Sequence, residues 1–127
     1  MKKLLLLLFS LIISFNSFGE WRLVTIGDNV GNKFYIDFDS VNKKNGYVYY
    51  WNLIDLVKPD DWGDLSAKIL YEVDCNLPYK ERGISYNYYK APMGQGSPSA
   101  TDNIINDWRY ATPGSVREQT IEAVCEY

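Results

Sequence analysis

The chain has 127 residues, of which 13 are Lys or Arg, 16 are Asp or Glu and none is His, so its formal net charge is −3. This balance offers no basic surface for nucleic acid or for an anionic membrane, and neither partner is expected. Without histidine, His-dependent catalysis is excluded, and two cysteines are too few for a structural zinc site, so no catalytic residue, metal or other cofactor is expected.

The first part of the chain has the layout of a secretory signal peptide. Lys2 and Lys3 precede an apolar run over Leu4–Ile13, and small residues lead to an expected cleavage after Gly19. The run is shorter than the roughly 20 residues of a membrane-spanning helix, although an uncleaved anchor is the alternative. We therefore expect export to the periplasm, to the cell surface or into the medium. The mature part, residues 20–127, would be one domain without a membrane span.

Five segments of the mature chain are expected to be β-strands, because they are rich in aromatic and β-branched residues or alternate with a period of two. They are residues 20–26, 33–37, 47–57, 66–75 and 79–90. The third segment carries apolar or aromatic side chains on both faces, which is typical of a central strand.

The region before the C-terminal segment is less regular. Residues 91–103 are rich in Gly, Pro and Ser and are expected to form a mobile loop. Residues 104–111 are compatible with either a helical turn or a strand. No helix or strand is predicted with defined bounds in either stretch.

The C-terminal segment is predicted to be a short amphipathic helix. Ser115 is a good N-cap, and Glu118 three residues later completes a capping box. One side of the helix would carry Val116, Thr120, Ala123 and Val124, with Ile121 at its margin. A helix this short is marginal alone, so we expect it to lie across one face of an antiparallel sheet.

The two cysteines are expected to form a disulfide. Cys75 ends an alternating segment and shares a face with Ile69, Tyr71 and Val73, which predicts that it points into the core. An even number of cysteines in an exported domain favours a disulfide, and Cys125 is the one available partner.

Several residues are candidates for a functional site. Tyr86, Tyr88 and Tyr89 form a candidate binding face, although core or solvated strand positions explain them equally well. Acidic residues could form a sugar-facing cluster or simply cap turns; they are Asp60, Asp61 and Asp64 around Trp62, and also Asp37 and Asp39. Residues 28–32 are a weaker candidate for calcium, because they supply few oxygen ligands.

In order along the chain, a set of residues resembles the surface-adhesin protein E family of bacterial envelope proteins. The set is Trp21, Tyr35–Asp37 with Ser40, Trp51, Ser66, Asp74–Cys75, Trp108, Pro113–Ser115 and Cys125. The resemblance implies an α+β fold with a single antiparallel sheet of about six strands and a C-terminal helix tied to it by the disulfide. Well-known members are surface lipoproteins that hold host extracellular-matrix proteins, whereas here no cysteine stands directly after the apolar run, where a lipid would be attached.

The resemblance and the composition together predict an exported, non-enzymatic envelope protein that binds a protein or an extracellular polymer. The alternative is a small periplasmic domain that binds or cleaves carbohydrate through loop Asp residues. An exposed aromatic strand edge could also pair with a second copy, so a homodimer is a further expectation.

Overall fold

The computed structural model describes residues 20–27 and 29–127. The expected signal peptide and Asp28 of the candidate calcium segment lie outside the described residues. The strands are β1 (Trp21–Ile26), β2 (Lys33–Lys44), β3 (Tyr47–Asp55), β4 (Ser66–Asp74), β5 (Lys80–Tyr89), β6 (Ala100–Asp102) and β7 (Arg109–Tyr110). The helices are the 3-10 helix η1 (Pro92–Gly94) and the α-helix α2 (Val116–Cys125).

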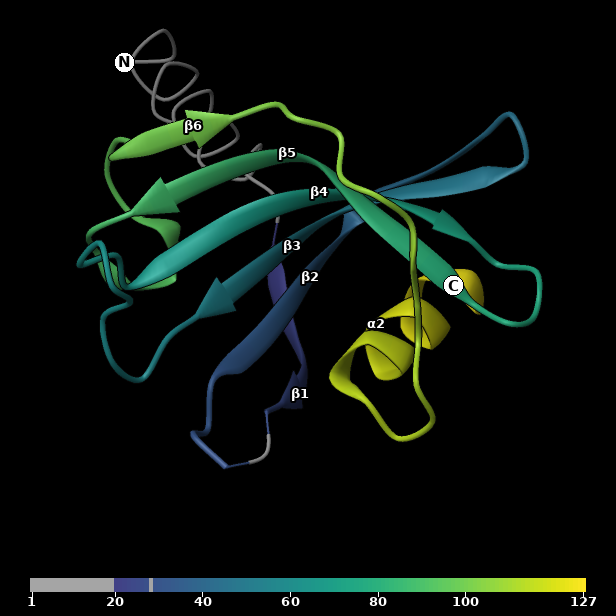
Figure 1. The fold of residues 1–127 in the computed structure, drawn as a ribbon, viewed down its shortest axis with the longest axis horizontal. Coiled ribbons are helices and arrows are strands. Elements are labelled where there is room, and N and C mark those ends of the chain that lie inside the picture. The colour runs from purple at the N-terminus through teal and green to yellow at the C-terminus, as the bar shows by residue number, and fades with distance from the viewer. Residues whose placement is uncertain (1–19, 28) are drawn as a thin grey trace, which may run out of the picture.

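The strands form one antiparallel sheet in which β1 to β6 follow one another in chain order (Figure 1). The short strand β7 also pairs with β5, at the end opposite to β6. The helix α2 lies across one face of the sheet, against β1, β2 and β3. The predicted α+β fold, with a single sheet and a C-terminal helix, is confirmed.

Strand β2 continues beyond its expected end at Asp37 because a bulge interrupts its pairing with β3 without ending the strand. Asp37 pairs with Trp51, whereas Asn42 already pairs with Tyr49, so the residues between them are extra. The Ser40 hydroxyl donates to the Asp37 carbonyl oxygen at 2.5 Å and accepts from the Trp51 amide at 3.0 Å. A serine side chain therefore replaces the ladder hydrogen bonds that the bulge interrupts.

The core lies between α2 and the sheet. Its buried members are Ile36, Val48, Tyr50, Val73, Ile121 and Val124. Ile121 was expected at the margin of the helix, yet it is fully buried, since the helix turns this side chain toward the sheet. Burial of such side chains supplies most of the free energy that keeps a short helix folded.

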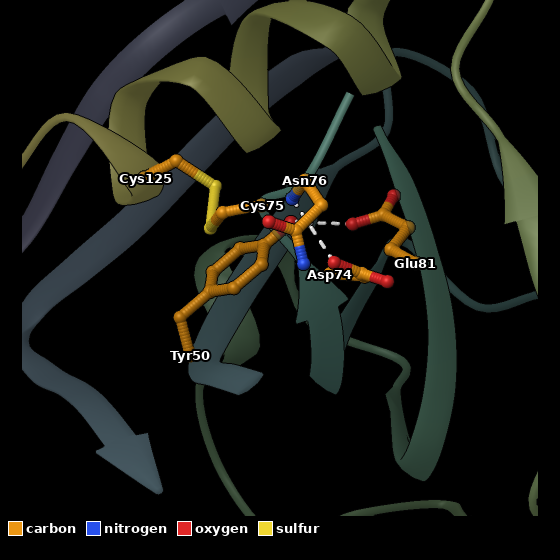
Figure 2. Close-up of a disulfide and its surroundings, with 6 residues drawn as sticks. All are labelled: Tyr50, Asp74, Cys75, Asn76, Glu81 and Cys125. Carbon is orange, nitrogen blue, oxygen red and sulfur yellow. Dashed lines mark hydrogen bonds between the residues drawn. A yellow bond between two sulfur atoms is a disulfide. The ribbon is translucent and has the colours of Figure 1, made fainter. Parts of the chain in front are cut away.

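A disulfide between Cys75 and Cys125 fastens the helix to the sheet, as predicted (Figure 2). Cys75 directly follows β4 and Cys125 is the last residue of α2, with 5.8 Å between their Cα atoms. Both cysteines pack against the core. The bond therefore holds the C-terminal end of α2, while capping holds its other end.

The N-terminal end of α2 is capped much as its sequence predicts. The Ser115 hydroxyl accepts a hydrogen bond of 3.1 Å from the Glu118 amide. The Glu118 carboxylate reaches one residue further back than in a standard capping box and accepts from the Gly114 amide at 3.0 Å.

The segment from residue 91 to residue 111 is more ordered than its composition predicts. It contains η1 and both short strands, β6 and β7. Ser66 secures η1: its hydroxyl donates to the Ala91 carbonyl oxygen at 2.7 Å and accepts from the Gly94 amide at 2.8 Å. Trp108 secures the later part, because its ring lies within 4.9 Å of Lys80 and 4.5 Å of Arg82.

Among the described residues, no helix has both the length and the apolar character needed to cross a membrane.

Candidate binding surface

An apolar row crosses the sheet from beside the first turn of α2 toward the end where β5 meets β6. Neighbouring strands place one residue each in this row, which runs through Phe34, Ile54, Ala67, Tyr88 and Ala100. Cross-strand partners share one face of a sheet, so these side chains lie on the same face as the helix. Figure 1 shows that α2 lies well away from the end of the sheet where β5 meets β6. None of the five residues is fully buried.

Two of the three candidate tyrosines are brought together on this face. The rings of Tyr86 and Tyr88 are stacked, with centroids 6.4 Å apart and planes inclined by 9°. The Asn106 side chain donates to the Tyr86 hydroxyl oxygen at 2.5 Å. Partial burial raises the pKa of both tyrosines above its ordinary value.

The third tyrosine is on the other side of the sheet. Tyr89 has only 5% of its surface exposed, and the Lys68 ammonium lies 4.9 Å from the centre of its ring. η1 covers this opposite face, where Gly94 comes close to Leu53 and Lys68. The structure therefore separates Tyr89 from the surface that Tyr86 and Tyr88 share.

A hollow of about 420 Å³ lies beside Tyr88 at the end of the apolar row. It is lined by Trp62, Asp64, Tyr88, Lys90, Ser99 and Ala100. Trp62 is the most prominent of these residues, because 78% of its surface is exposed. An exposed tryptophan beside a hollow and two stacked tyrosines is an arrangement typical of a protein-binding surface.

The loop that presents Trp62 is held by several hydrogen bonds. The Asp60 carboxylate accepts from the amides of Trp62 at 3.0 Å and Asp64 at 2.8 Å. The Asp64 carboxylate lies 3.1 Å from the Lys90 ammonium and accepts from the Ser99 hydroxyl at 2.7 Å. The hydrogen bond from Ser99, together with Lys90, lowers the pKa of Asp64, which keeps this carboxylate ionised.

Several of the candidate sugar-facing acids accept hydrogen bonds from backbone amides and so stabilise the local structure. Asp60 and Asp64 build the Trp62 loop, and Asp37 accepts from the Asp39 amide at 3.1 Å in the bulge of β2. Asp61 is exposed. The arrangement gives the carbohydrate-cleaving alternative no support, because glycosidases hold two carboxyl groups on either side of a sugar bond.

The candidate calcium segment also has a structural contact. The side-chain oxygen of Asn32 accepts from the Val57 amide at 3.0 Å. Within residues 20–27 and 29–127 there is no group of three or more His, Cys, Asp or Glu that could hold a metal ion.

The family model of surface-adhesin protein E matches residues 21–126, which is nearly the whole chain. The chain belongs to the surface-adhesin protein E family. No curated protein and no solved structure matches it. In this member of the family, the serines that carried the resemblance are framework residues: Ser40 closes the bulge, Ser66 secures η1 and Ser115 caps α2.

The aromatic surface of this family member is formed by residues outside that framework set. Trp62 lies in the loop between β3 and β4, and Tyr88 lies in β5. The pairing of β4 with β5 brings the two residues together. The sequence offered Trp62 and the tyrosines as separate candidates. Their proximity could not be predicted without the sheet order.

Proposed function

We propose that this member of the surface-adhesin protein E family is an exported, non-enzymatic envelope protein that binds a protein partner through Trp62, Tyr86 and Tyr88. The observation that carries the proposal is the exposed Trp62 ring beside a hollow that Tyr88 also lines. Tryptophan and tyrosine are enriched among the residues that contribute most to protein–protein binding. Family membership supports the adhesin role.

The rigidity of the surface supports the same proposal. The Trp62 loop is fixed by Asp60, Asp64 and Lys90, and the tyrosines stand on a strand of the sheet. A pre-organised aromatic surface loses little conformational entropy when a partner binds. The apolar row toward Phe34 extends the surface beyond the hollow, which enlarges the area that a partner could bury.

Export is supported by the signal-peptide pattern and by the disulfide, since disulfides persist in oxidising compartments. Fractionation of the producing cells, combined with the mass of the purified protein, tests this part. The mass gives the cleavage site, and the compartment in which the protein appears distinguishes periplasm, cell surface and medium. A homodimer would show in the same material as twice the monomer mass under native conditions.

Binding is tested with Trp62→Ala against a panel of immobilised extracellular-matrix proteins. We expect binding to weaken roughly tenfold or more, as at a hot spot. Leu77→Ala is the matched control, because Leu77 is equally exposed, at 79%, but lies in the turn between β4 and β5. Equal binding by the wild type and the Trp62 variant would reject the surface. Retention on polysaccharide instead of protein would reject the partner class.

A further inference from the structure

A second hollow, of about 470 Å³, lies on the face of the sheet opposite to α2. Its lining includes Tyr49 and Trp51 from β3, together with Asn42, Lys44 and Asn45 from the hairpin that joins β2 to β3. Successive residues of a strand point to opposite faces, and the residue between the two rings is buried in the core under α2. The rings of Tyr49 and Trp51 therefore face away from the helix and away from the Trp62 surface.

The bulge of β2 shapes this hollow. Asp37 pairs with Trp51 and Asn42 pairs with Tyr49, so the extra residues of β2 all stand opposite the short step between the two rings. A bulge bends the strand that contains it. Ser40, within the bulge, and Asn42, just after it, both border the hollow. The hollow is thus part of the folded framework.

The aromatic floor of the hollow is held in place by hydrogen bonds. The Tyr49 hydroxyl donates to the Glu72 carboxylate, which Arg82 holds from its other oxygen at 2.7 Å. The Trp51 amide donates to the Ser40 hydroxyl oxygen at 3.0 Å. Rings that are fixed before a ligand arrives lose little conformational entropy when it binds.

Polar side chains stand beside this row of rings. Asn42 is the cross-strand partner of Tyr49, and Lys44 is the cross-strand partner of Tyr47, the next ring along the same face of β3. Asn42, Lys44 and Asn45 are all exposed. The hollow therefore offers two carboxamides, each with a donor and an acceptor, and one ammonium group, which only donates.

The charge at the Lys44 end of the hollow is positive. Within residues 20–27 and 29–127, Lys44 takes part in no salt bridge, and no carboxylate lines the hollow. Glu72, next to the hollow, is already neutralised by Arg82. Asp37 stands beside Trp51, roughly 14 Å along β3 from the level of Lys44. An anionic group is therefore attracted to the Lys44 end.

These features match the chemistry of a sugar. One face of a pyranose ring presents C–H groups that pack on an aromatic ring, and its edge carries neighbouring hydroxyl groups that a carboxamide binds with its donor and acceptor together. A divalent metal ion would need several carboxylate or carbonyl ligands. An apolar side chain of a protein would use the rings but not the carboxamides or the ammonium group.

We propose that this hollow binds a segment of an acidic oligosaccharide. Its sugar rings pack on Tyr49 and Trp51, and its hydroxyl groups bond to the carboxamides of Asn42 and Asn45. The carboxylate of a uronic or sialic acid unit pairs with the Lys44 ammonium. The site is independent of the proposed protein-binding surface, so the two faces of the sheet bind partners of different chemistry.

The test is a titration of the purified, nitrogen-15-labelled protein followed by NMR. Trigalacturonate and sialyllactose are the acidic probes, galactotriose and lactose are their neutral counterparts, and triglutamate is an acidic peptide probe. We expect saturable shifts of the Trp51 indole N–H and of the Asn42 and Asn45 side-chain amides with an acidic sugar. The neutral counterpart should bind about threefold more weakly, since it lacks one exposed ion pair. Saturation by trigalacturonate alone would identify a uronic acid, and saturation by sialyllactose alone a sialic acid.

Two variants at exposed positions test the assigned contacts. Lys44→Gln should weaken binding of the acidic sugar about threefold and leave that of its neutral counterpart unchanged. Lys43→Gln is the matched control, because Lys43 is also exposed but pairs with Val48 on the face that α2 covers. Asn45→Gly keeps the positive φ of 55° at this turn and removes the carboxamide, so it should weaken binding of acidic and neutral sugars alike.

The proposal would be overturned by the absence of a saturable shift with either acidic sugar, and this outcome needs no variant to fold. Equal binding of acidic and neutral sugars would reject the acidic class, and equal or tighter binding of triglutamate would reject the sugar. An equal effect of Lys43→Gln and Lys44→Gln would show a general charge effect and no site. Trp62→Ala should leave the sugar-induced shifts unchanged, so this site and the proposed protein-binding surface can fail separately.

Discussion

The Tyr50 hydroxyl donates a hydrogen bond of 3.0 Å to the carboxylate of Glu81 beneath the helix (Figure 2). Both side chains are buried, and Glu81 has 4% of its surface exposed. Burial raises the pKa of Glu81 to about 7, against the opposing effects of Tyr50 and Arg117. The carboxyl group thus connects β3, β5 and α2, and its burial makes its ionised form less favourable than in water.

The stability of the protein should fall as the pH rises toward 7 because of Glu81. Its pKa is about 7 in the folded state and near 4.5 in the unfolded state, so the folded protein binds more protons between these values. The contribution of the group to the free energy of unfolding is therefore fully present below pH 4.5 and is lost as the pH passes 7, on the order of 3 kcal/mol in total. Urea denaturation at pH 5 and pH 8 measures this change.

Glu81→Gln is the control for that experiment. Glutamine keeps the size of the side chain but cannot ionise, so the decline in stability between pH 5 and pH 8 should be much smaller than in the wild type. If both proteins show the same pH dependence, another group is responsible and Glu81 titrates normally.

Cys125→Ser should lower the melting temperature without affecting any chemical reaction. The disulfide joins residues separated by 50 positions in the sequence, and closing a loop of that size stabilises the folded state by about 4 kcal/mol in the chain-entropy model. Calorimetry should show the melting temperature falling by roughly 15 °C or more. Cys75→Ser should have the same effect, and the double variant should add little; a clearly additive loss would mean that the cysteines act separately.

Ser66→Ala should loosen η1 and its surrounding loop. The Ser66 hydroxyl pairs with the Ala91 carbonyl oxygen and the Gly94 amide, and the residue is almost fully buried. Its removal leaves two backbone groups without partners, which should cost about 2 kcal/mol of unfolding free energy. Hydrogen exchange at the Gly94 amide should become faster. Ser85→Ala, which removes a hydrogen bond at the surface, should change stability by less than about 0.5 kcal/mol.

The sheet, the helix and the disulfide were all predictable, because each has a local signal. Alternation marked the strands, a serine and a glutamate three residues apart marked the start of α2, and two cysteines left one pairing. The extension of β2 past Asp37 was not predictable, since it depends on the Ser40 hydroxyl bonding to Trp51 on the next strand. The same holds for η1, which needs Ser66 from β4.

The candidate site was predictable only in part. Tyr86 and Tyr88 share a face because they are two residues apart, and the same period places Tyr89 on the other face. Asn52 and Glu81 carried no signal in the sequence, because their burial arises only when the strands pair and α2 packs beside them. Polar residues that become buried through distant contacts look like surface residues in the sequence.

Asn52→Leu should stabilise the protein by about 1 kcal/mol, because it replaces an unpaired buried polar group with an apolar one beside a cleft that has room for it. Urea denaturation at constant pH measures the change. Asn87→Leu is the matched control, since Asn87 is a half-buried residue on the other face, and it should bring no comparable gain. A loss of stability in Asn52→Leu would contradict the prediction and would mean that ordered water already satisfies the Asn52 oxygen.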